Sequence, residues 1–142
     1  MNLQELQELA DKDLKINDTE LDIESLKTPQ LHNKYCKFLS KFKTLQKQSE
    51  TDYNRLYKEK WEYYTGKSDP SVYQLKPFNL KILKPDVDKY IKADTEIIKA
   101  DQKLSYLNDI VDYLEKTIRL ISNRGFTIKN AIDWKKFTSG VI

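Results

Sequence analysis

The stretch "PDVDKYIKADTEIIKADQKLSYLNDIVDYLEKTIRLISN", Pro85 to Asn123, carries the strongest regularity in the chain. Two apolar rows run along it, each repeating every seven residues, and the second lies three residues after the first. The first row is Tyr90, Ile97, Leu104, Val111 and Ile118, and the second is Ala93, Ala100, Leu107, Leu114 and Ile121, with Ile91, Ile98 and Ile110 beside them. Five consecutive heptads with both core positions apolar predict a long helix, about residues 86–123, that packs against another helix. Pro85 is typical of its start and Gly125 of its stop.

Another long helix is predicted at about residues 29–65. Thr28 and Pro29 form the pattern of a capping hydroxyl followed by a proline at the first helical position, and neither Gly nor Pro follows until Gly66. The apolar positions are first spaced alternately four and three residues apart, and the face then becomes wider and more aromatic. The regular part is Leu31, Tyr35, Phe38, Phe42, Leu45 and Ser49, and the aromatic part is Tyr53, Leu56, Tyr57, Trp61 and Tyr64.

The remaining segments are predicted to be short. Leu3, Leu6 and Leu9 share one face of an N-terminal helix, and Asp18 resembles the N-cap of the next helical segment. Between the long helices, apolar and polar residues alternate, which favours an extended segment or a β-hairpin. The alternating residues are Phe78, Leu80 and Ile82, and their partners in a hairpin would lie around Tyr73 and Leu75.

After Gly125, Thr127 resembles the N-cap of a short C-terminal docking helix. Its apolar residues are Ile128, Ala131, Ile132 and Phe137. With only three glycines and four prolines in 142 residues, and a third of the residues charged, we expect a mainly α protein with one domain, residues 1–142.

The net charge of +3 conceals an uneven distribution. Residues 1–29 hold three lysines and eight carboxylates, a net charge of −5, so the other 113 residues carry +8. A basic body with an acidic N-terminal arm, residues 1–28, suits a polyanionic partner. A well-solvated helical surface without such a partner explains the charge equally well.

The residues needed for most catalytic and metal sites are scarce. His32 is the only histidine and Cys36 the only cysteine, so the chain has no internal disulfide and no cysteine-based metal cage. A Cys–His nucleophile also needs a pocket and oxyanion donors, which the sequence does not indicate. There is no glycine-rich phosphate loop, and the paired aspartates at 11 and 13 and at 86 and 88 suit helix starts. We therefore expect no enzyme activity, no cofactor and no metal. No apolar run is long enough to cross a membrane, so we expect a soluble, intracellular protein.

Two helices of roughly 55 Å each leave a long apolar seam to cover. Association with further copies of the chain covers it, and so does an antiparallel hairpin of the two helices within one chain. The sequence leaves both arrangements open.

The segment "YKEKWEYYTGK", Tyr57 to Lys67, combines three lysines with four aromatic residues. At about 100° per residue, Tyr53, Tyr57, Trp61 and Tyr64 form one stripe, with Lys60 beside it and Arg55 and Lys58 on another side. Rings that stack on unpaired bases and cations that neutralise phosphates are what single-stranded nucleic acid requires. The alternative is that the rings complete the apolar seam while the lysines extend out of it. Lys58 and Lys60 point about 200° apart, so one strand along one face cannot readily touch both.

The segments "KEKWEYYTGK", "KADTEIIKADQKLSYLNDIVDYLEKTI" and "ISNRGFTIKNAIDWKKF" resemble the UvsY-type recombination mediators of T4-like bacteriophages. The resemblance extends along nearly the whole chain in the same order. It implies a non-enzymatic factor that binds single-stranded DNA, weakens the hold of the single-strand-binding protein, and helps load a RecA-like recombinase into a presynaptic filament. It also implies a ring-like homo-hexamer or homo-heptamer assembled through the C-terminal part, in the cytoplasm of the bacterial host.

The family's DNA-binding motif resembles Lys-x-Arg-Leu, which here reads Lys58-Glu59-Lys60-Trp61. The first cation matches, whereas lysine replaces the arginine and tryptophan the leucine. The predicted divisions are the acidic arm (1–28), the DNA-binding helix with the extended segment (29–85), and the self-association region (86–142). The predicted nucleic-acid-binding residues are Arg55, Tyr57, Lys58, Lys60, Trp61, Tyr64 and Lys67, and the predicted self-association residues are Ile97, Leu104, Leu107, Val111, Leu114, Ile118 and Ile121.

Overall fold

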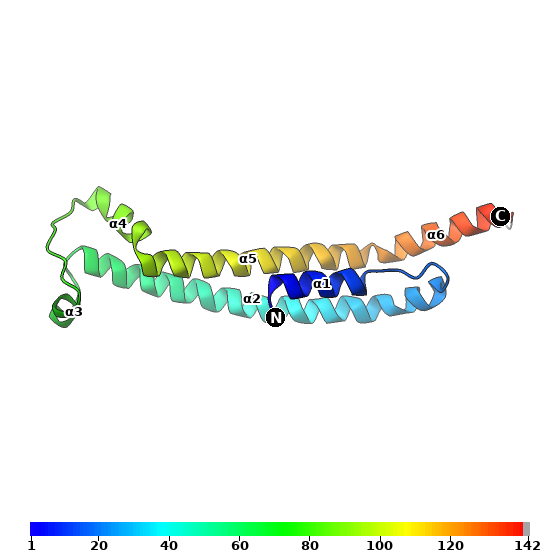
Figure 1. The fold of residues 1–142 in the computed structure, drawn as a ribbon, viewed down its shortest axis with the longest axis horizontal. Coiled ribbons are helices and arrows are strands. Elements are labelled where there is room, and N and C mark those ends of the chain that lie inside the picture. The colour runs from blue at the N-terminus through cyan, green and yellow to red at the C-terminus, as the bar shows by residue number, and fades with distance from the viewer. Residues whose placement is uncertain (141–142) are drawn as a thin grey trace. The chain divides into compact units, whose positions relative to one another are not determined.

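A computed structural model describes residues 1–140, and within them the chain is helical with no β-strand. In chain order the elements are α1 (Leu3–Asp13), α2 (Leu21–Tyr64), α3 (Pro70–Leu75), the short 3-10 helix η1 (Lys84–Asp86), α4 (Val87–Ala93), α5 (Thr95–Ser122) and α6 (Arg124–Ser139), as Figure 1 shows. The mainly α prediction is confirmed. The chain forms two compact units: unit 1 contains residues 1–43 and the chain from residue 109, and unit 2 contains residues 44–108.

In unit 1, the first part of α2 runs antiparallel to the end of α5 and the start of α6. Lys43 lies 3.5 Å from Glu115, while Glu24 pairs with Arg124. The core lies between these helices and α1, and its buried apolar residues are Leu6, Ala10, Leu21, Tyr35, Phe42, Ile110, Val111, Leu114, Ile121 and Ile128. The Tyr35 hydroxyl donates a hydrogen bond of 3.0 Å to Asp13, which fastens the end of α1 to α2.

Unit 2 has the same antiparallel arrangement. The Gln46 amide donates to Asn108 at 2.6 Å, and Lys60 lies 3.3 Å from Asp94. The buried residues of its small core are Val87, Ile91 and Ile97. Five partly buried apolar residues pack against them: Tyr53, Leu56, Tyr57, Tyr64 and Ile82. Pairing of the two helices within one chain, which the sequence left open, is therefore present in each unit.

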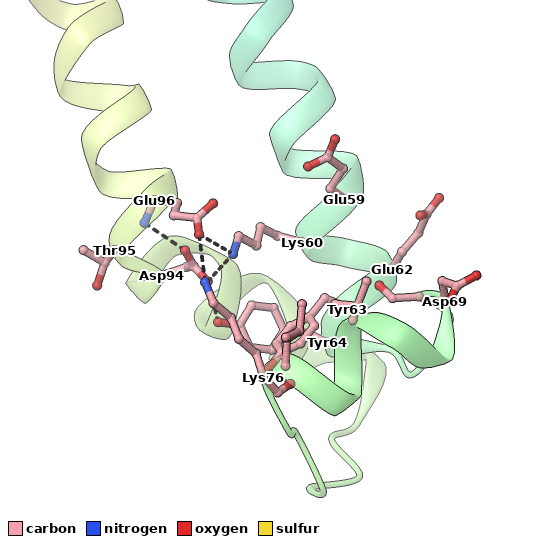
Figure 2. Close-up of a pocket in the computed structure, with 13 residues that line it drawn as sticks. Glu59, Lys60, Glu62, Tyr63, Tyr64, Asp69, Lys76, Asp94, Thr95 and Glu96 are labelled. Atoms are coloured by element: carbon pink, nitrogen blue, oxygen red, sulfur yellow. Dashed lines mark hydrogen bonds and ion pairs between the residues drawn. The ribbon is translucent and has the colours of Figure 1, made fainter.

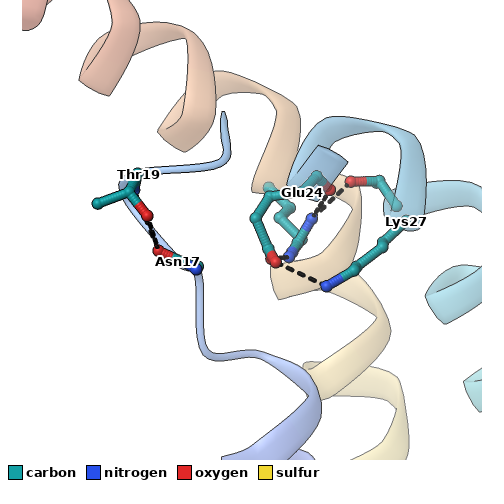
Figure 3. Close-up of polar contacts among 6 residues, drawn as sticks. Asn17, Thr19, Glu24 and Lys27 are labelled. Carbon is teal, nitrogen blue, oxygen red and sulfur yellow. Dashed lines mark hydrogen bonds and ion pairs between the residues drawn. The ribbon is translucent and has the colours of Figure 1, made fainter. Parts of the chain in front are cut away.

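The start of α2 differs from the prediction. The helix begins at Leu21 and continues through Pro29, which lacks the N–H group that a helix interior requires. The Arg124 side chain lies beside this turn: it donates to the Glu24 carbonyl and, at 3.0 Å, to the Thr28 hydroxyl, and it pairs with the Glu24 carboxylate at 2.5 Å. Figure 3 shows Glu24 beside Lys27, whose Nζ lies 2.8 Å from the Glu24 carboxylate. These contacts fasten the start of α6 to the turn of α2 that precedes Pro29. Thr28 is not an N-cap, because the helix already begins at Leu21.

The Asp18 cap is also wrong. Residues 15–20 are irregular, and the Asn17 side chain accepts hydrogen bonds from the amide and hydroxyl of Thr19, as Figure 3 shows. The predicted N-terminal helix is confirmed as α1, where Asn2 and Glu5 form a capping box and Leu6 and Ala10 are buried.

The predicted helix 86–123 is interrupted at Asp94, which has an extended backbone (ψ 131°) and separates α4 from α5. The interruption changes which face is buried. In α4, Val87 and Ile91 are in the core, whereas Tyr90 is 36% exposed and Ala93 is exposed. From Ile97 onward the heptad pattern holds, because Leu107, Leu114 and Ile121 are all buried.

At the other end of α5, the predicted helix end at about residue 123 is confirmed, but Gly125 does not mark it. The helix ends at Ser122, and α6 begins at Arg124 and runs through both Gly125 and Thr127. The C-terminal helix is therefore confirmed, but it is longer than predicted and Thr127 is not its cap. Ile128 is its buried apolar residue.

The segment after α2 forms a helix where a hairpin was one alternative. Gly66, at φ +78°, ends α2 as predicted: the Lys67 amide donates to the Glu62 carbonyl at 2.8 Å and the Gly66 amide to the Tyr63 carbonyl at 3.3 Å. Asp69 then caps α3 by accepting from the Ser71 amide, and Pro70 occupies the first turn. Residues 77–83 are irregular, so the hairpin is not formed.

We expect Arg124→Ala to lower the free energy of unfolding by about 2–3 kcal/mol, because it leaves a buried carboxylate with one cation and removes donors beside Pro29. Urea unfolding followed by circular dichroism measures the change, and the exposed Arg119→Ala is the matched control.

Hydrogen bonds from Lys27 outweigh burial and, with those from Arg124, hold the pKa of Glu24 below its ordinary value of 4.5. The stabilisation by ionised Glu24 is therefore complete above pH 4.5 and declines as the pH falls through the lowered pKa. Equal stability of the two variants at pH 7 would contradict this role.

Candidate nucleic-acid interface

Lys60 is the centre of an ion-pair network in unit 2. Its side chain is only 14% exposed, and its Nζ lies 3.3 Å from Asp94 Oδ2 and 3.5 Å from Glu96 Oε1. Lys76 reaches the same Glu96 oxygen at 3.3 Å. Figure 2 shows Lys60 of α2 and Lys76, which follows α3, both reaching Glu96 at the start of α5. Lys60 therefore joins α2 to α5 within the chain.

Asp94 is the acceptor that organises this network. One of its oxygens accepts from the Glu96 amide at 2.9 Å, which caps α5, and the other accepts from the Tyr64 hydroxyl at 2.7 Å. Burial raises the pKa of Asp94, but the hydrogen bonds from Tyr64, the Glu96 amide and Lys60 outweigh it and hold this pKa below its ordinary value. Burial and the bond to Asp94 raise the pKa of Tyr64. The carboxylate is thus ionised and the phenol neutral at neutral pH.

A cleft of about 650 Å³ opens beside Lys60, and we call it the acidic cleft. Its thirteen lining residues include five carboxylates and two lysines. They are Glu59, Lys60, Glu62, Tyr63, Tyr64, Ser68, Asp69, Val72, Leu75, Lys76, Asp94, Thr95 and Glu96 (Figure 2). This excess of negative charge disfavours a phosphate backbone on the side of α2 that Lys60 faces.

The residues of the aromatic stripe have two different environments: three of the rings are packed inside unit 2 and one is exposed. Tyr53, Tyr57 and Tyr64 pack against the core of unit 2. The Tyr57 hydroxyl donates to Asp88 at 2.7 Å, and this bond, with burial, raises the pKa of Tyr57. These rings fasten α4 to α2. This agrees with the alternative that the rings complete the apolar seam of the helix.

Trp61 is the exception. It is 40% exposed, and Lys67 Nζ lies 4.5 Å from the centre of its ring. Arg55 and Lys58 are also exposed, and Lys58 has one partner of its own helix, Glu62, at 3.8 Å. An accessible ring with three accessible cations is the combination that stacks on bases and neutralises phosphates.

The residues predicted for self-association lie mostly inside the chain. Ile97, Leu107, Val111, Leu114 and Ile121 are at most 8% exposed, and Leu104 and Ile118 are half-buried. The most exposed large apolar side chains of residues 86–140 are others: Leu120, Phe126, Trp134 and Phe137, each between 62% and 69% exposed. Sequence reasoning missed these as a surface because the heptad rows drew attention to the core positions.

On α2, His32, the only histidine, is exposed and Cys36, the only cysteine, is half-buried, with His32 Nδ1 3.7 Å from Cys36 Sγ. Within residues 1–140, no cluster of three or more His, Cys, Asp or Glu side chains could hold a metal ion. None of the helices described is both long and apolar enough to cross a membrane.

Residues 9–141 match the family described as "Recombination, repair and ssDNA binding protein UvsY". The chain belongs to the UvsY family. The resemblance seen in the sequence is therefore confirmed. The recombination protein uvsY of Enterobacteria phage T4 is 27% identical over 140 residues, which cover 99% of each chain.

Solved UvsY structures have the same fold. The crystal structure of the bacteriophage T4 recombination mediator protein UvsY in lattice type II aligns with a TM-score of 0.87 and 27% identity over 98% of each chain. In lattice type I the TM-score is 0.84, with 27% identity over 94% of this chain and 98% of the other. Of the two lysines at positions 58 and 60, Lys58 is exposed and Lys60 is paired within the chain.

We expect Lys60→Ala to lower the free energy of unfolding by about 2 kcal/mol, because it leaves Asp94 with fewer partners in a partly buried site. The matched control, Lys58→Ala, removes the same charge from an exposed position and should change it by less than about 0.5 kcal/mol. Urea unfolding monitored by circular dichroism gives both values. Indistinguishable midpoints for the two variants would show that Lys60 has no structural role.

Proposed function

We propose that this chain is a recombination mediator of a T4-like phage. It binds single-stranded DNA, helps to displace the single-strand-binding protein, and loads a RecA-like recombinase to form the presynaptic filament during recombination and repair in the cytoplasm of the bacterial host. Membership of the UvsY family along residues 9–141 is the observation that carries the proposal.

The surface of unit 2 supports the DNA-binding part. Arg55, Lys58 and Lys67 are exposed cations, and Trp61 is an accessible ring beside Lys67. Tyr57 and Tyr64 contribute by positioning: their hydroxyls hold α2 to Asp88 and Asp94, so the ring and cations are carried on a fixed helix. A preorganised surface loses little conformational entropy when a strand binds.

Exposed apolar side chains of the C-terminal region support self-association, for which we propose a homo-hexamer or homo-heptamer. On α6, Trp134 and Phe137 stack on each other with ring centres 5.7 Å apart, yet both are 64% exposed. Exposed apolar clusters of this kind are typical of protein–protein contacts. The heptad residues form the core of each chain, and the exposed apolar residues of α5 and α6 provide the contact between copies.

Self-association explains how a small cationic surface holds DNA tightly. Each copy presents few contacts, but copies in one particle bind the same strand at a high effective concentration. Bending the strand across several copies then favours release of the single-strand-binding protein and exposes the DNA to the recombinase. The acidic arm, residues 1–28, offers a surface of opposite sign for a basic partner.

We expect the protein to bind a labelled, unstructured single-stranded oligonucleotide at low salt and to lose affinity as salt rises. The slope of log K against log salt should be about −0.7 for each phosphate neutralised. Replacing Arg55 and Lys58 together with alanine should make the slope shallower, as fluorescence anisotropy would show. If no binding occurs at low salt, a helical scaffold without a nucleic-acid function becomes the better assignment.

We expect Trp134→Ser with Phe137→Ser to give particles of smaller mass by light scattering, with unchanged helicity by circular dichroism. The control is Leu75→Ser, which removes an 86% exposed apolar side chain from α3 in unit 2. A wild-type mass for the α6 variant would remove α6 from the contact between copies.

A further inference from the structure

A second cleft lies next to Trp61, and its chemistry is opposite to that of the acidic cleft. It has a volume of about 730 Å³, and we call it the basic cleft. Three of its twelve lining residues are lysines and none is acidic. They are Trp61, Tyr64, Thr65, Gly66, Lys67, Phe78, Asn79, Leu80, Lys81, Ile82, Lys84 and Val87.

The walls of this cleft are fixed by the packing of unit 2. Ile82 packs against the core residues Val87, Ile91 and Ile97, which anchors the irregular segment 77–83. Phe78 contacts Tyr64 edge-on, with ring centres 5.0 Å apart. Lys81 and Lys84, on either side of Ile82, are both exposed. The anchored Ile82 therefore holds two exposed lysines, one on each side of it, at the wall of the cleft that Trp61 also lines.

The two clefts separate the residues of the motif region by charge. Lys60 lines the acidic cleft, where its ammonium is already paired, whereas Trp61 lines the basic cleft. Neighbouring residues on a helix point about 100° apart, which is how one helix end serves both clefts. A polyanion is attracted to the cleft that lacks carboxylates and repelled from the one that has five.

We propose that the basic cleft is the path of single-stranded DNA across unit 2. An unpaired base stacks on the Trp61 indole, and Lys67, Lys81 and Lys84 neutralise the adjacent phosphates. This inference rests on the proposed function and adds residues 78–84 to the binding surface. It also places Lys60 off the path of the strand. Duplex DNA, whose bases already stack on each other, lacks the unpaired base that the indole accepts.

The decisive variant is Lys81→Ala with Lys84→Ala. Loss of two phosphate contacts should make the log–log salt slope for a labelled oligo-dT shallower by about 1.4 per bound copy, with weaker binding at low salt. The matched control is Lys89→Ala with Lys92→Ala, which removes the same charge from exposed positions on α4 outside the cleft, where each lysine pairs with a carboxylate of its own segment. The control should keep the wild-type slope.

Trp61 provides an independent readout. Trp61→Ala should weaken binding by about tenfold through loss of stacking. Oligo-dT should quench tryptophan emission of the wild-type protein, and Trp61→Phe should abolish the quenching, because the remaining Trp134 belongs to α6 and not to the cleft. A duplex of matched length should quench far less.

Two results would overturn the inference while leaving the proposed function intact. The first is binding by the Lys81/Lys84 variant that matches the Lys89/Lys92 control in affinity and slope. The second is quenching that persists in Trp61→Phe. By contrast, failure of the wild-type protein to bind oligo-dT at low salt would remove the proposed function itself. Helicity and particle mass are measured for every variant, and a lysine-to-glutamine pair at 81 and 84 replaces the alanine pair if the latter does not fold.

Discussion

The carboxylate of Asp94 is the interaction on which the geometry of unit 2 depends. It separates α4 from α5, caps α5 through the Glu96 amide, and receives the Tyr64 hydroxyl and the Lys60 ammonium. A partly buried charge is stable only with such partners, so each is held in one place. The direction of the helix end that carries Trp61 follows from this arrangement, and so does the separation of the two clefts.

The placement of charge in unit 2 matters more than its total. The whole chain has a net charge of only +3, yet one cleft is lined by five carboxylates and the other by three lysines without a carboxylate. Lys58 and Lys60 are chemically identical and two residues apart, but their side chains are 79% and 14% exposed. A lysine that is mostly buried between carboxylates is a structural residue, whatever motif it occupies.

Local patterns predicted the helices well and their interruptions poorly. The heptads from Ile97 to Ile121 and the Gly66 stop follow from periodicity and backbone conformation, which the sequence displays directly. The contact of Arg124 with the turn before Pro29 could not be predicted, because its partner Glu24 lies 100 residues earlier in the chain. The family and its cationic segment were predictable from the sequence. The only sequence signal for the internal pairing of Lys60 was its place beside the aromatic stripe, and nothing in the sequence signalled Lys81 and Lys84 in the cleft that Trp61 lines.

The contact between Arg124 and the turn before Pro29 has a consequence for the nascent chain. The residues that flank the proline leave the ribosome long before the arginine that supplies their donors, since 100 residues separate the Arg124 and Glu24 partners. Closing so large a loop has an entropic cost that local helix formation does not offset. The contact between Arg124 and Glu24 therefore forms only after α6 has been synthesised, later than the local hydrogen bonds of α2.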